Sequence, residues 1–167
     1  INHPTYSEQP MLVFGAGYDK QQYENGAANT VGAGIYLVDA KTGDVVWSTD
    51  KISFDGTDSI VGRIATLDTD YDGYTDRLYA ADTGGKIWRV DLAGSNFSDW
   101  SAFEFASLPG PFFYQPEVAR SYYSKVTSYE ENGDVLNVSR MTVPFEAVVI
   151  GSGDRTNPLG ESNDNLF

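Results

Sequence analysis

Short apolar runs alternate with turns rich in Gly, Asp and Asn along this 167-residue chain. Runs of this length, bounded by turn residues, are typical of strands in an all-β protein. We expect strands at residues 11–14, where the apolar run predicts a buried strand, and at residues 60–67 and 77–81. The polar segment 18–33 predicts a long loop, and the Phe-, Pro- and Gly-rich segment 98–116 predicts an irregular connection.

Two predicted hairpins share one pattern. Residues 35–39 and 44–47 flank a turn that ends at Gly43, and residues 78–82 and 86–91 flank a turn that ends at Gly85. Glycine supplies the positive φ that such turns need. In both hairpins a Tyr lies three residues before an Asp, and a Trp lies in the second strand. Tyr36 and Tyr79 are 43 residues apart, close to the length of about 40–45 residues of a four-stranded propeller blade.

This repeat predicts an all-β fold, a partial or modified β-propeller, with residues 1–167 forming a single domain or a fragment of one. A further, longer hairpin is predicted at residues 120–129 and 135–143, joined by residues 130–134. The Asn132-Gly133 pair within that connection strongly favours a tight turn.

Acidic residues occupy alternate positions around one glycine in the segment 68–76, which reads Asp-Thr-Asp-Tyr-Asp-Gly-Tyr-Thr-Asp. Loops that hold Ca²⁺ supply oxygen ligands from positions 1, 3, 5 and 7, with a glycine at position 6. Counted from Asp68, these ligands are Asp68, Asp70, Asp72 and the Tyr74 carbonyl. Position 12 is a tyrosine rather than the closing Glu of an EF-hand, so we expect Asp76 to close the cage.

Because strands are predicted on both sides of residues 68–76, the sequence predicts a calcium loop at the tip of a β-hairpin. An Asp- and Gly-rich turn without a metal is the alternative, since both residues are ordinary turn formers. Four carboxylates within nine residues repel one another unless a cation is present, which favours the metal.

Net charge and residue content exclude several classes of partner and active site. A net charge of −13 and a pI near 4.2 argue against nucleic acid and anionic membrane surfaces as partners. Cysteine is absent, and the single histidine, His3, lies at the N-terminal end. The sequence therefore offers few residues for a Ser-His-Asp or Cys-His catalytic site. We expect a protein that is not an enzyme, with no direct membrane insertion because no long apolar run occurs. Modest oxygen-cage sites stay filled at extracellular calcium levels, which favours an extracytoplasmic location.

The chain resembles the C-terminal propeller of type IV pilus biogenesis factors of the PilC/PilY kind. The resemblance rests on residues 61–85, which include the acidic loop, on the following Ile87-Trp88-Arg89-Val90-Asp91, and on shorter matches at 13–18, 116–119 and 149–155. It implies a modified propeller of quinoprotein-like blades and Ca²⁺ ligands at Asp68, Asp70, Asp72, Asp76 and the Tyr74 carbonyl.

The same resemblance implies that calcium occupancy controls pilus extension against retraction in twitching motility and surface attachment. It implies a place at the pilus tip, outer membrane or cell surface. The expected partners are calcium, pilins or minor pilins, and a host or abiotic surface contacted through the full-length protein.

Two other classes of protein fit parts of the sequence. An integrin-like adhesion propeller also carries Asp-x-Asp-x-Asp-Gly-x-x-Asp loops, although such proteins typically repeat the loop in several blades. A quinoprotein dehydrogenase ranks lower. Its tryptophan-docking repeat is similar to residues 39–47, but that motif is structural and does not establish the enzyme activity.

Overall fold

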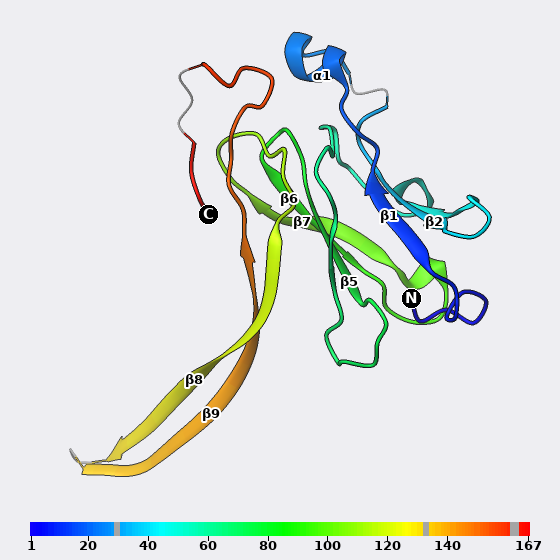
Figure 1. The fold of residues 1–167 in the computed structure, drawn as a ribbon. Helices are drawn as coiled ribbons and strands as arrows, with labels where there is room; N and C mark the ends of the chain where they lie inside the picture. The colour runs from blue at the N-terminus through cyan, green and yellow to red at the C-terminus, as the bar shows by residue number, and fades with distance from the viewer. Residues whose placement is uncertain (29–30, 132–133, 161–163) are drawn as a thin grey trace.

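The computed structural model describes residues 1–28, 31–131, 134–160 and 164–167, and its fold is mostly β-sheet (Figure 1). The strands are β1 Met11–Gly15, β2 Ile35–Asp39, β3 Val45–Ser48, β4 Ala65–Leu67, β5 Arg77–Ala81, β6 Lys86–Asp91, β7 Ser101–Ser107, β8 Glu117–Glu131 and β9 Asp134–Val149. Short helical segments are α1 Lys20–Asn25 and the 3-10 turns η1 Thr49–Lys51 and η2 Phe97–Asp99. The prediction of an all-β chain is confirmed at this level.

All strand pairs are antiparallel and form three sheets among the described residues. One sheet has four strands in the order β4-β5-β6-β7, a second has three in the order β1-β2-β3, and the third is the pair β8-β9. The first two sheets have the consecutive antiparallel order of propeller blades, but within the described ranges they do not form a closed ring.

The two predicted hairpins are present as β2-β3 and β5-β6. Gly43 and Gly85 take the expected positive φ, at 81° and 93°. The hairpins differ in their polar contacts. Asp82 is fully buried and accepts hydrogen bonds from the Lys86 N–H at 2.9 Å and from the Trp88 indole N–H at 2.7 Å. The corresponding Asp39 accepts from the Lys41 N–H at 2.7 Å, as Asp82 does from the Gly84 N–H at 2.9 Å, so the indole contact is what sets Asp82 apart.

Two hydrophobic clusters hold the fold together. The first buries side chains from both larger sheets, among them Leu37, Trp47, Leu78 and Trp88. The second joins the inner strands of the four-stranded sheet to the base of β8 and β9, where Val118 and Val148 pack against it. Burial of this apolar area is the main favourable term in folding, and the second cluster fixes the β8-β9 pair to the rest of the molecule.

The predicted long loop at residues 18–33 was wrong in part, because α1 occupies its first third. The Asp19 carboxylate caps this helix by accepting the backbone N–H groups of Gln21 and Gln22 at 3.0 and 3.2 Å. Gly26 ends the helix in the left-handed conformation, with φ at 65°. An N-cap Asp and a C-terminal Gly are the usual signals of a helix, and this pair encloses only six residues.

Other boundaries also differ from the predictions. Segment 98–116 contains a regular strand, β7, which extends the four-stranded sheet by pairing with β6. The apolar run at residues 11–14 is only half-buried, since Leu12 and Phe14 alternate outward along β1. The strand predicted at 60–67 is limited to Ala65–Leu67.

The predicted long hairpin is confirmed and is longer than expected, running from the pair Glu117↔Val149 to the pair Glu131↔Asp134. Its turn residues, Asn132 and Gly133, lie outside the described residues. We call β8 and β9 together the arm, because they project away from the two larger sheets (Figure 1).

As for membrane contact, the described residues include no helix with the length and apolarity needed to span a bilayer.

Candidate metal centre

The acidic segment 68–76 connects β4 to β5, which pair directly at Leu67↔Arg77. The loop is therefore the tip of a β-hairpin, as the sequence predicts. The Asp76 N–H donates to the Leu67 carbonyl at 2.9 Å and closes the base of the loop. Within the loop, Tyr71 and Gly73 take left-handed φ values of 65° and 92°, which turn the chain back on itself.

Three of the predicted ligands come together. Asp68, Asp70 and Asp76 each offer a carboxylate oxygen, and these three atoms all lie within 4.8 Å of one another. Oxygens bound to Ca²⁺ lie about 2.3–2.6 Å from the ion, so two ligands of one ion are at most about 5 Å apart. The three carboxylates therefore have the spacing that a shared Ca²⁺ requires. Asp68 and Asp76 are half-buried, and Asp70 is exposed.

Backbone N–H groups orient each of the loop carboxylates. Asp68 accepts from the Tyr71 N–H at 2.6 Å and from the Gly73 N–H at 2.9 Å. Desolvation acts to raise the pKa of Asp68, but the N–H groups of Gly73, Tyr71, Asp70 and Asp72 together lower this pKa below its usual value. The loop thus favours the ionised carboxylate, which is the form that binds a cation.

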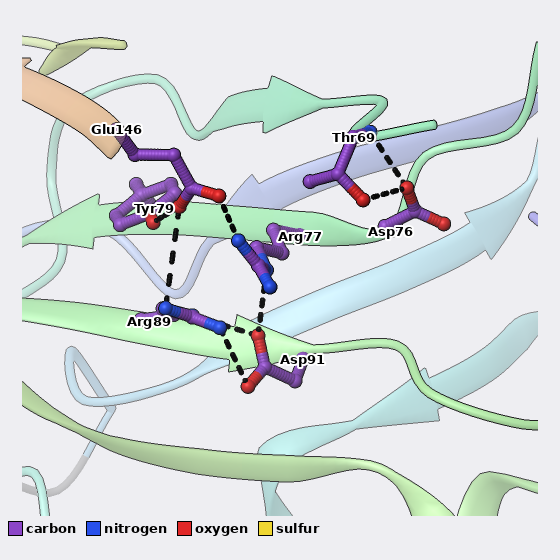
Figure 2. Close-up of polar contacts among 7 residues, drawn as sticks. All are labelled: Thr69, Asp76, Arg77, Tyr79, Arg89, Asp91 and Glu146. Carbon is purple, nitrogen blue, oxygen red and sulfur yellow. Dashed lines mark hydrogen bonds and ion pairs between the residues drawn. The ribbon is translucent and has the colours of Figure 1, made fainter. Parts of the chain in front are cut away.

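Thr69 was not among the predicted site residues, yet it positions Asp76. Its backbone N–H and its hydroxyl both donate to Asp76 Oδ2 at 2.6 Å (Figure 2). Thr69 therefore fixes the orientation of the Asp76 carboxylate, which offers one oxygen to the group with Asp68 and Asp70. A threonine at position 2 of the loop is the sequence signal for this contact.

The remaining predicted ligands lie elsewhere in the same loop. Asp72 is exposed, and its carboxylate accepts the Tyr74 N–H at 2.8 Å. It does not belong to the group formed by Asp68, Asp70 and Asp76. Liganding by Asp72 and by the Tyr74 carbonyl stays a prediction.

A charged network, which sequence reasoning missed, begins one residue after Asp76. Arg77 contacts Asp91 at 3.3 Å, and it also contacts Glu146 of β9. Arg89 donates to both carboxylate oxygens of Asp91, at 2.7 and 3.0 Å. The Tyr79 hydroxyl donates to Glu146 (Figure 2). Tyr79 and Glu146 are 67 residues apart in the sequence. A local sequence motif therefore could not predict this network.

The loop also faces the arm directly. The Arg120 guanidinium of β8 lies over the Tyr71 ring, 5.9 Å from its centroid. A cavity of about 370 Å³ separates the two parts and is lined by Thr69 and Asp70 on the loop side and by Arg120 and Phe145 on the arm side. The candidate metal centre and the base of the arm are thus neighbours.

Comparison with known proteins finds a relative that matches part of the chain. The chain is 33% identical over 97 residues to the type IV pilus biogenesis factor PilY1 homolog of Xylella fastidiosa (strain Temecula1 / ATCC 700964). The match supports a family-level relationship to type IV pilus biogenesis factors. It covers 53% of this chain and 6% of the relative's length. No protein-family profile matches the chain, and no solved structure matches it.

Proposed function

We propose that this chain is a calcium-binding, non-enzymatic part of a type IV pilus biogenesis protein. The observation that carries the proposal is the convergence of the Asp68, Asp70 and Asp76 carboxylates at the tip of a hairpin. Asp68, Asp70 and Asp76 would hold the ion, with Asp72 and the Tyr74 carbonyl completing the ligand set. The bound ion would supply the positive charge that offsets the repulsion among these groups.

The partial similarity to a PilY1 homolog supports the pilus assignment. On this proposal the blades belong to a modified propeller, the protein acts outside the cytoplasm at the pilus tip or cell surface, and pilins or minor pilins are its partners. Calcium occupancy would then control pilus extension against retraction. The physical basis is that a filled loop has one fixed shape, whereas repelling carboxylates favour other shapes.

Titration calorimetry with CaCl₂ tests the metal site in this chain. We expect Ca²⁺ to bind the unmodified chain and Asp70→Asn to weaken that binding by at least about tenfold, since an exposed ligand is lost without a packing change. Asp44→Asn is the matched control, because Asp44 is exposed in a different hairpin turn. Equal affinity in the Asp70→Asn and Asp44→Asn chains would contradict the proposed cage.

The regulatory part of the proposal needs a cellular measurement. Asp70→Asn, introduced into the complete protein in its natural host, should alter surface pilus number or twitching, whereas Asp44→Asn should not. If calcium binding is lost in the purified chain but pilus number and twitching remain unchanged, the ion has a structural role and the regulatory proposal is wrong.

A further inference from the structure

The arm stands clear of the two larger sheets beyond its first few residues. Near its base, Val118 and Val148 pack into the second hydrophobic cluster. From Ser121 to Ser128 every side chain of β8 is exposed, and the paired stretch of β9 from Val138 to Thr142 is exposed as well. An isolated two-stranded ribbon is only marginally stable in water. A third strand or a covering surface would stabilise this one.

Both edges of the arm lack a strand partner among the described residues, since its sheet contains only β8 and β9. Outward-pointing N–H and C=O groups on such edges form a template for another strand. The two edges differ. Pro144 lies within β9, opposite Tyr122, and a proline interrupts the pairing capacity of an edge. The exposed stretch of β8 contains no proline and no register shift, so the β8 edge is the open one.

Apolar side chains cover both faces of the arm. Tyr123 and Met141 project from one face and are 50% and 56% exposed, while Tyr122 and Val138 project from the other and are 55% and 61% exposed. On the first face, the rings of Tyr123 and Phe145 lie 6.0 Å apart. Successive side chains of a strand added at the edge would point to opposite faces of the arm, and would therefore lie beside the apolar side chains on each face.

The middle of the arm is cationic, although β8 and β9 together contain five acidic and three basic residues and the chain as a whole carries a net charge of −13. The charged residues between Val118 and Ser128 and between Val138 and Phe145 are Arg120, Lys125 and Arg140, with no acidic residue in either stretch. This local charge is complementary to an acidic partner. An anionic lipid surface would satisfy the charge but would leave the edge N–H and C=O groups without partners in hydrocarbon. The combination favours a protein.

We propose that the β8 edge from Ser121 to Ser128 is a docking site for an acidic, extended protein segment that adds to the arm as a third antiparallel or parallel strand. Main-chain hydrogen bonds supply affinity, Lys125 and the two arginines select for acidic side chains, and the exposed tyrosines contact the apolar side chains of the added strand. The proposal goes beyond the calcium hypothesis, because docking at this edge does not require a filled loop.

Binding of a designed peptide to the complete chain tests this proposal. The probe is a fluorescein-labelled peptide with Glu and Val alternating over eight residues, measured by anisotropy in excess EDTA so that the calcium hypothesis cannot affect the result. We expect the Glu-Val peptide to bind more tightly than a Lys-Val peptide. A Glu-Val peptide N-methylated at alternate residues should bind at least about tenfold more weakly, because it cannot complete the strand ladder.

A charge variant and amide exchange locate the site. Lys125→Glu should weaken Glu-Val peptide binding roughly three- to tenfold, whereas the control Lys41→Glu, in an exposed turn of another hairpin, should not. In NMR hydrogen exchange, bound peptide should slow the outward-facing amides of β8 and leave those of β9 near Pro144 unchanged. Unlike affinity alone, this readout distinguishes strand addition from simple charge attraction.

The proposal is overturned by any of three results: no binding of the Glu-Val peptide, binding that N-methylation leaves unchanged, or no slowing of β8 amide exchange. Vesicles containing phosphatidylglycerol provide the contrasting ligand. If the arm binds these vesicles in a Lys125-dependent manner and does not bind the peptide, the surface is a membrane site and the strand-addition proposal is wrong.

Discussion

The Arg77 guanidinium contacts the Glu146 carboxylate, and this ion pair joins the strand that leaves the acidic loop to the base of the arm (Figure 2). Both side chains are largely buried, with 29% and 13% of their surface exposed. The pair is one part of a network in which Asp91 and Arg89 balance the charges. Because β5 begins at Arg77, the network ties the position of the arm to the first residue of this strand.

Arg77→Ala should lower the free energy of unfolding by about 1–3 kcal/mol, a value below that of a fully buried pair because solvent still reaches Arg77. Glu146 would lose its closest cationic partner. Urea denaturation measures the change, and Lys20→Ala serves as the control because the Lys20–Glu24 pair is exposed on α1. A double-mutant cycle with Glu146→Gln should show coupling, and additive effects would mean that the two residues act independently.

Thr69→Val should weaken Ca²⁺ binding by about tenfold without unfolding the chain, because it removes one of the two hydrogen bonds that hold Asp76 Oδ2. The backbone N–H bond remains. Titration calorimetry provides the measurement, and Thr66→Val, at an exposed position on β4, is the control. An unchanged affinity would show that Asp76 needs no support from the Thr69 hydroxyl.

Gly85→Ala should destabilise the fold by at least about 3 kcal/mol, whereas Gly43→Ala should cost about 1 kcal/mol. Both glycines have positive φ, but a Cβ at Gly85 would lie 2.3 Å from the Leu108 carbonyl oxygen, whereas a Cβ at Gly43 would meet nothing within 4 Å. Thermal and urea unfolding of the two variants separate steric overlap from backbone strain. Equal costs would contradict the close approach of residue 108.

Asp82 should make the chain less stable as pH rises through the acidic range. Desolvation raises its pKa above the ordinary value of 3.8, despite hydrogen bonds from Trp88 and the Lys86 N–H. The folded state therefore holds the proton more tightly than the unfolded state, so this contribution to stability is present below pH 3.8 and is lost as pH rises through the folded-state pKa.

The Asp82→Asn chain should lack this trend, although it is less stable throughout, because both Asp82 oxygens accept hydrogen bonds and Asn replaces one of them with an NH₂ group that cannot accept. Urea unfolding of both chains across the acidic range provides the comparison. A free-energy difference between the two chains that does not change with pH would rule out a raised pKa for Asp82.

Features encoded by neighbouring residues were predictable from the sequence. The turns at Gly43 and Gly85 follow from the left-handed backbone that they require, and the loop from Asp68 to Asp76 follows from its alternating carboxylates. The missed features depend on distant parts of the chain. Strand β7 is stabilised by its pairing with β6, and Glu146 lies at the base of the arm but 67 residues along the chain from Tyr79, so neither has a local signal.

The degree of burial of a strand also could not be predicted from the local sequence pattern. The apolar run 11–14 resembles a fully buried strand, but β1 lies at the edge of its sheet and exposes Leu12 and Phe14. The number of layers around a strand decides how many of its faces are covered, and this number is a property of the whole fold.

The geometry of the arm also determines how it would carry mechanical load. A strand of 15 residues spans about 50 Å at roughly 3.3 Å per residue. A pull that separates β8 from β9 at the tip breaks their hydrogen bonds one pair at a time, whereas a pull along the β8 edge loads many of them together. The arm would therefore resist tension along its length far better than peeling, while the ion pairs at its base transmit the force to the four-stranded sheet.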